Sequence, residues 1–75
     1  MLNLQMPFIY RLETKDDGPV HINTLDIITI KNSDNNSNWS LVESRQGFTY
    51  VSYLSPEELV ADILNSYNLT MKAYR

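Results

Sequence analysis

The motif Ser55-Pro56-Glu57-Glu58 constrains the fold of this chain more than any other feature, because it specifies where a helix begins. Serine is a preferred N-cap, proline suits the first helical position, and a glutamate three residues after the cap completes a capping box. Apolar residues then recur at helical spacings of three and four, and they are Leu59, Val60, Ile63, Leu64 and Tyr67. The pattern predicts a C-terminal helix over residues 56–67 that packs on a sheet.

The residues before this helix alternate in the manner of antiparallel strands. Met6–Glu13 and Val20–Asn23 have a period of two, and the turn Lys15–Pro19 separates them. A second hairpin is predicted over Trp39–Leu54, with its turn at Ser44–Gly47. Both hairpins are expected to contribute to one antiparallel sheet.

Between the two hairpins, the β-branched run Leu25–Lys31 reads as a further strand with a slip in its phase. Ile27 and Ile28 are adjacent, so both cannot face one side of a regular strand; either a bulge falls here or both faces of the sheet are covered. The polar stretch Asn32–Asn38 is expected to be an exposed loop. After the helix, residues 68–75 alternate weakly and form either a short edge strand or a frayed tail.

These elements predict one α+β domain over residues 1–75: an antiparallel sheet of four or five strands, with one C-terminal helix packed on one face. A chain of 75 residues has no room for a second core. The absence of cysteine excludes a disulfide scaffold, a cysteine zinc finger and a thiol nucleophile. A single helix covers only one face of a sheet, which favours a homo-oligomer or a protein partner on the other face.

The charge balance is mildly acidic and argues against nucleic acid as a partner. Six basic residues stand against nine acidic ones, for a formal net charge of −3. Binding to a phosphate backbone generally requires a basic surface. No segment has the pattern of a secretory signal or the length of a membrane span, so we expect a cytoplasmic protein that does not contact a membrane.

We searched the sequence for the residue constellations of catalysis and of metal binding. Asp34-x-Asn36-x-Asn38 imitates the first half of a calcium loop, but the glycine and the bidentate glutamate that complete such a loop are missing. His21 is the only histidine, and no second ligand for a transition metal accompanies it. Ser40 or Ser44 as a nucleophile would need an elbow or an oxyanion loop that the sequence lacks. We therefore predict no enzyme activity, no metal site and no cofactor.

Aromatic residues and the acidic start of the helix are the remaining candidates for binding. The residues singled out are Trp39, Arg45, Tyr50, Tyr53, Glu57 and Glu58. Aromatic side chains on a small sheet usually form a core or a protein interface. They can also stack a base, and a small nucleotide held between subunits needs only a few cations, such as Arg11, Arg45 and Arg75.

Part of the chain resembles the small FlbD-type flagellar proteins. The matching stretches are Trp39-Ser40-Leu41 through Gly47, Tyr50-Val51 and Ser55-Pro56-Glu57-Glu58 through Leu64, about half of the chain. The resemblance implies a few strands followed by a C-terminal helix, with no catalytic residues. In size and composition the chain also resembles small acidic phage-encoded inhibitor proteins, which bind and block one host or immune component.

Three functions follow as expectations. The first is a non-enzymatic protein-binding module, of the phage inhibitor kind, that acts as a homo-oligomer or with a partner through an exposed sheet face and the acidic helix start. The second is an oligomeric protein that sequesters a small nucleotide. The third, implied by the resemblance, is a small flagellar protein with a regulatory or structural role.

Overall fold

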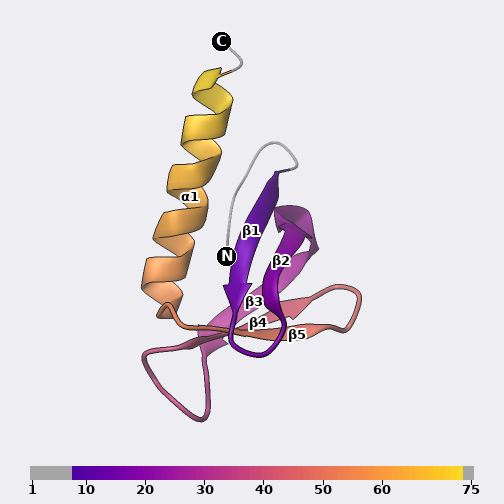
Figure 1. Ribbon diagram of the computed structural model, residues 1–75, viewed down its shortest axis with the longest axis vertical. Coiled ribbons are helices and arrows are strands. Elements are labelled where there is room, and N and C mark those ends of the chain that lie inside the picture. Colours follow the sequence, from indigo (N-terminus) through magenta and orange to yellow (C-terminus); the bar gives the residue numbers. More distant parts are fainter. Residues whose placement is uncertain (1–7, 74–75) are drawn as a thin grey trace.

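The described residues form two β-hairpins, a short 3-10 turn with a further strand between them, and one long helix. The computed structural model describes residues 8–73, and Figure 1 shows their order. The elements are Ile9–Thr14 (β1), Gly18–Asn23 (β2), a 3-10 turn at Thr24–Asp26, Ile27–Asn32 (β3), Ser40–Ser44 (β4), Thr49–Ser52 (β5) and Pro56–Ala73 (α1). The protein is therefore α+β, as the sequence predicts.

The first hairpin joins β1 to β2 in an antiparallel register that pairs Leu12 with Val20 and Thr14 with Gly18. Gly18 closes the turn with φ 66°, a conformation that side chains with a Cβ rarely adopt. The hydroxyl of Thr14 donates a hydrogen bond of 2.6 Å to the Gly18 carbonyl and fixes this end of the hairpin. The predicted strand start at Met6 lies outside the described residues, and the strand as described begins at Ile9.

The second sheet has the order β3-β4-β5, with both pairs antiparallel. The register shifts between Ile27 and Thr29, so of the two alternatives that the sequence left open at the adjacent isoleucines the structure shows the irregular strand, which we call the bulge. Ile27 packs against the core, whereas Ile28 turns outward and is 48% exposed. The turn between β4 and β5 ends at Gly47, whose φ is 88°.

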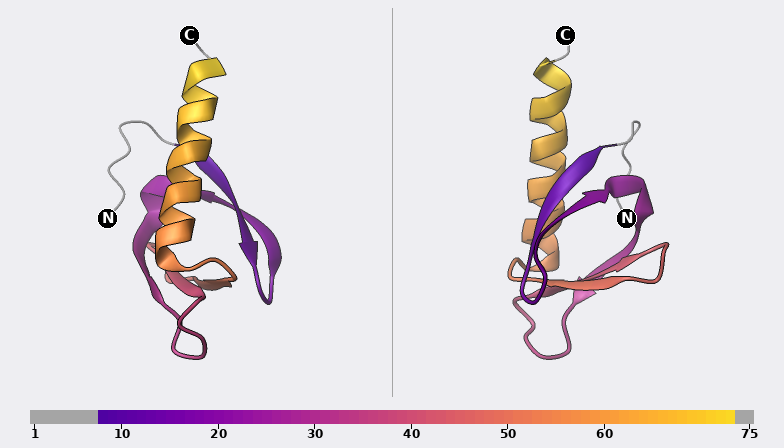
Figure 2. Two further views of the ribbon diagram at one scale, coloured as in Figure 1. Left: turned by 90° about the vertical axis from the view of Figure 1, so that its left-hand side faces the viewer. Right: turned by 45° about the vertical axis from the view of Figure 1, so that its right-hand side comes forward.

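The expectation of one continuous sheet of four or five strands is not confirmed, because the five strands divide into a pair and a triplet. The backbone N–H of Lys15 donates a 2.8 Å bond to the carbonyl of Val51 and joins the end of β1 to β5. The 3-10 turn and the bulge at Ile28 redirect the chain between β2 and β3. Figure 2 shows the first hairpin crossing the second sheet instead of extending it.

The core lies where both sheets meet α1. The buried apolar side chains are Tyr10, Leu12, Ile22, Val42, Leu59 and Ile63. They come from β1, β2, β4 and α1, so each sheet and the helix contribute to one cluster. Of the apolar helix face that the sequence predicts, Leu59 and Ile63 are buried in this core, whereas Val60 and Tyr67 are half-buried and Leu64 is exposed.

The predicted capping box is confirmed at the start of α1. The backbone N–H of Glu58 donates to the Ser55 hydroxyl at 3.2 Å, and the Ser55 N–H donates to the Glu58 carboxylate at 3.0 Å. Hydrogen bonding of the Glu58 carboxylate to the Ser55 backbone N–H, and secondly to the Ser55 side chain, lowers the pKa of Glu58. The box also fixes the direction in which the helix leaves β5.

The end of α1 differs from the prediction. The helix continues to Ala73, so Asn68–Ala73 forms neither an edge strand nor a frayed tail, and residues 74–75 lie outside the described residues. Asn65 and Asn68 do not end the helix, because no glycine or proline follows them and the helical spacing continues through Met71. Within residues 8–73, no helix has the length and apolar character needed to cross a bilayer.

The loop between β3 and β4 is mostly exposed, as predicted, but hydrogen bonds hold it together. The Asn32 side chain donates to the Ser37 carbonyl at 2.7 Å, and the Asn38 N–H donates to the Asn36 side chain at 2.9 Å. Ser33 is an exception to the prediction, because it is buried and its N–H donates to the Trp39 carbonyl.

Candidate functional site

The structure separates the aromatic residues that the sequence suggested as one binding platform. Trp39 and Tyr53 flank β4 and β5 at one end and meet edge to face, with ring centroids 5.3 Å apart. Tyr50 lies toward the other end, where its ring stacks on Phe48 at 6.4 Å. The side chain of Arg45 is tied to the Leu25 carbonyl by a 2.9 Å bond from Nε.

The two glutamates of the predicted site have different surroundings. Glu58 is engaged in the capping box with Ser55. Glu57 is exposed and borders an open apolar surface on the helix together with Val60 and Leu64. These carboxylates therefore do not act as a pair.

An apolar surface centred on Phe48 is the most coherent candidate site. Phe48 is 56% exposed and forms a ridge between two shallow hollows, because it lines both of them. We call this region the Phe48 surface and define it by Val20, Ile22, Ile28, Phe48 and Tyr50. Its residues come from β2, β3 and the second hairpin, so the crossing of the two sheets creates it.

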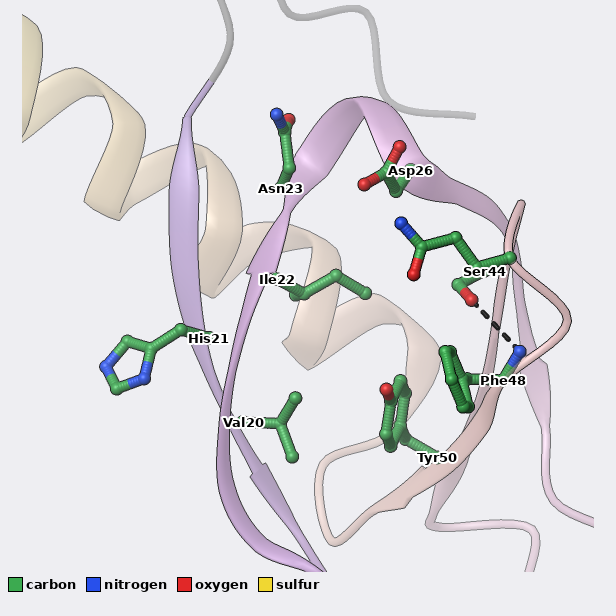
Figure 3. A pocket seen from close by; sticks show the side chains of 9 residues that line it. Val20, His21, Ile22, Asn23, Asp26, Ser44, Phe48 and Tyr50 are labelled. Carbon is green, nitrogen blue, oxygen red and sulfur yellow. Dashed lines mark hydrogen bonds between the residues drawn. The ribbon is translucent and has the colours of Figure 1, made fainter.

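The first hollow, of about 150 Å³, lies between β2 and the second hairpin (Figure 3). Val20 and Ile22 point from β2 toward Phe48 and Tyr50, whereas the side chain of His21 points away. Alternation along β2 explains this difference, because successive side chains face opposite sides of a strand. The hollow thus has apolar side chains on two facing sides, and polar groups make up much of the rest of its lining.

Polar groups surround one end of this hollow. Asn23 and Asp26 lie there in Figure 3, and Gln46 also lines the hollow. The backbone N–H of Arg45 donates a 2.7 Å bond to the backbone carbonyl of Asp26 and so holds the hairpin turn against the 3-10 turn. An apolar wall beside a carboxylate and two amides suits an apolar group that carries a hydrogen-bond donor or a positive charge.

The second hollow lies on the other side of Phe48 and has a volume of about 200 Å³. Ile28 and Thr29 of β3 line it opposite Phe48 and Thr49. Glu43 also lines it and forms an ion pair of 3.5 Å with Lys31. Ile28 reaches this surface because the bulge rotates it away from the core.

The volumes of the two hollows beside Phe48 distinguish a small-molecule ligand from the side chains of a protein partner. Small-molecule sites usually enclose about 300–1,000 Å³. Volumes of about 150 and 200 Å³ are smaller than this and correspond to single side chains. The Phe48 surface therefore suits the anchor residues of a protein better than a whole nucleotide.

A larger hollow of about 360 Å³ lies beside Tyr53 and contains a distinctive pair, Tyr10 and Asp62. The Tyr10 hydroxyl donates a 2.5 Å bond to the Asp62 carboxylate, and burial followed by this bond raises the pKa of Tyr10. Arg11 and Glu13 also line the hollow, and the two form an ion pair of 3.3 Å. With two carboxylates against one arginine, this hollow disfavours a phosphate group.

Sequence reasoning missed the central residues of the Phe48 surface. The candidate binding residues that the sequence suggests do not include Phe48 or Ile28, and the Ile27–Ile28 pair indicates only that the strand is irregular or that both sheet faces are covered. The available signals were the position of Phe48 directly after the turn glycine and the phase slip at Ile28, which places one isoleucine of the pair on the outer side.

The chain was compared with known proteins at three levels. No protein-family model, no curated protein and no solved structure matches it. The function must therefore be argued from the surfaces described above.

Proposed function

We propose that this chain is a non-enzymatic protein-binding module that recognises its partner through the Phe48 surface. The observation that carries the proposal is a solvent-exposed phenylalanine, 56% exposed, that stands between two side-chain-sized hollows. Exposed aromatic groups beside pockets dominate the energetics of protein interfaces. A polar margin around an apolar centre is the usual arrangement of such interfaces.

The charges around the surface indicate the chemistry of the partner. Asp26 lies at one end of the first hollow, Glu43 lines the second, and the whole chain has a net charge of −3. A matching partner presents a large apolar side chain with a lysine or arginine close to it. The apolar group enters the hollow beside Phe48, and the basic group approaches Asp26.

Peptide selection on the purified chain tests this proposal. Peptides selected from a random displayed library are expected to share an apolar residue next to a basic one. In amide-resolved NMR, a selected peptide should shift the signals of residues 20–23 and 46–50. The Phe48→Ser variant should bind at least about tenfold more weakly, a loss of about 1.4 kcal/mol.

Tyr53→Ser is the matched control, because Tyr53 is 55% exposed and lies at the other end of the same hairpin. This variant should bind the selected peptide as the unmodified chain does. Equal binding by the unmodified chain and the Phe48→Ser variant would refute the proposal. Selection of acidic peptides would refute the assigned partner chemistry.

A further inference from the structure

The second half of α1 has less packing than the first half, and its one aromatic contact among the described residues is that of Tyr67, whose ring meets Phe8 edge to face with centroids 5.8 Å apart. Leu59 and Ile63 are fully buried, but no residue from Leu64 to Lys72 is buried. Figures 1 and 2 both show the last turns extending past the strands. Helices shorter than about 12–15 residues are marginal in water without tertiary contacts. The projecting half is therefore expected to pack on another surface.

A second stripe of side chains runs along the whole of α1 beside the buried face. We call it the outer stripe and define it as Glu57, Val60, Leu64, Tyr67 and Met71, residues spaced alternately by three and four. Leu64 is 39% exposed, and Val60, Tyr67 and Met71 are half-buried. At the N-terminal end of the stripe, Pro56 and Ala61 extend it into an open and nearly flat apolar surface. This spacing is typical of helices that pair side by side.

We infer that a second copy of this chain covers the outer stripe, with the two α1 helices antiparallel about a two-fold axis between Asn65 and Ser66. In this arrangement Leu64 faces Tyr67 of the second copy, and Val60 faces its Met71. The projecting half of each helix then packs on the domain-proximal half of the other. Such a contact is isologous, the kind that closes a dimer.

Charge complementarity between the two ends of α1 favours a second copy of the chain as the partner, with its helix antiparallel to the first. The first half of α1 contains Glu57, Glu58 and Asp62, and its last turn contains Lys72. Glu57 and Lys72 lie on the same flank of the outer stripe, so an antiparallel pair brings Glu57 beside Lys72 of the second copy. The helix dipoles also oppose one another in this arrangement. A parallel pair would instead place the acidic ends together.

The expected contact area predicts a weak dimer. A helix of 18 residues is about 27 Å long and about 10 Å wide, so a side-by-side pair buries on the order of 1,000 Å² in total. Specific interfaces usually bury about 1,200–2,000 Å², which places this one just below the common range. We therefore expect dissociation in the micromolar range. The inference does not depend on the Phe48 surface, to which α1 contributes no residue.

Sedimentation velocity of the full chain, over about 1–500 μM, tests the inference with two matched leucine variants. Leu64→Gln should weaken dimerisation at least about tenfold. Leu69→Gln is the control, because Leu69 is 60% exposed on the same helix but lies about 140° around it from Leu64. Leu69→Gln should leave the dissociation constant unchanged, and circular dichroism should show that both variants are folded.

Charge reversal tests the antiparallel direction. Glu57→Lys and Lys72→Glu should each weaken the dimer, and the double variant should restore it. A chain that remains monomeric at every concentration would overturn the inference, as would equal effects of Leu64→Gln and Leu69→Gln or a double variant without rescue. A dimer abolished by Phe48→Ser but not by Leu64→Gln would assign self-association to the Phe48 surface, and would overturn the role of the outer stripe.

Discussion

The hydrogen bond between Tyr10 and Asp62 should stabilise the whole fold, because it connects the first strand to the C-terminal helix. The Tyr10 hydroxyl donates to the Asp62 carboxylate at 2.5 Å across 52 residues of sequence. Tyr10 is only 6% exposed, whereas Asp62 is exposed. A hydrogen bond to a charged group contributes about 1.5–3 kcal/mol, and hydration of the exposed carboxylate favours the lower end of that range.

We therefore expect Tyr10→Phe to lower the free energy of unfolding by about 1.5 kcal/mol. For a domain of this size, about 4–8 °C of Tm corresponds to 1 kcal/mol, so Tm should fall by roughly 6–12 °C. Urea denaturation gives the same quantity from the change in midpoint, with the slope m unchanged. Tyr53→Phe is the control, because it removes a hydroxyl from an exposed ring and should change stability by less than about 0.5 kcal/mol.

A double-mutant cycle separates the bond from the other effects of each substitution. The cycle combines Tyr10→Phe with Asp62→Asn and measures the coupling free energy between the two positions. A coupling of about 1–2 kcal/mol is expected if the bond stabilises the fold. A coupling close to zero would refute the reasoning, because it would show that a hydrogen bond from water to Asp62 is as favourable as the one from Tyr10.

Three further predictions concern ionisation, capping and a buried hydroxyl. Burial and its hydrogen bond raise the pKa of Tyr10, so the stability from its neutral form is complete below about pH 10 and is lost as the pH rises through the raised pKa. An absorbance titration should therefore show one tyrosine of the folded chain that ionises above the usual range and that is missing from the Tyr10→Phe variant. Ser55→Ala should lower the free energy of unfolding, measured by urea denaturation, by about 1 kcal/mol, because it removes the N-cap. Ser55→Thr should keep most of the stability that the N-cap contributes. Thr24→Val should raise the unfolding midpoint, because the Thr24 hydroxyl is buried without a hydrogen-bond partner among the described residues.

The parts of the fold that the sequence predicts well are those that local chemistry determines. The capping box at Ser55 and Glu58 places the start of α1 correctly, because the cap requires only residues within one turn. The adjacent isoleucines at 27 and 28 mark the place of the bulge as one of two alternatives, because a regular strand cannot direct neighbouring side chains to one face. In both cases the constraint lies within a few residues of the feature.

The parts that the sequence predicts poorly depend on contacts between distant segments. The strands divide into two sheets because the chain turns at Thr24–Asp26, and the alternation of each strand is the same in either arrangement. The helix passes Asn65 and Asn68 because neither residue is as strong a stop as glycine or proline. Periodicity identifies elements, but it does not determine how they are joined.

The candidate site illustrates the same limit at the level of single residues. Tyr50 and Tyr53 differ by three positions, and the end of β5 at Ser52 lies between them, so they belong to different aromatic pairs. Phe48 remains exposed because the hairpin turn carries it to the margin of the crossing sheets. Aromatic composition suggests candidate residues for a surface, but the tertiary arrangement decides which ring is exposed.

The two proposed surfaces together predict bivalent binding. A dimer formed through the outer stripe would carry two Phe48 surfaces, because no residue of α1 lines either hollow at Phe48. Two linked sites can raise apparent affinity for a dense target by roughly 10²–10⁴, without any change in the individual contact. Leu64→Gln should therefore weaken binding to a surface densely coated with the selected peptide, while binding to the free peptide in solution stays the same. Equal losses in both formats would show that Leu64 supports the Phe48 surface directly, and no loss in either would show that the two surfaces do not act together.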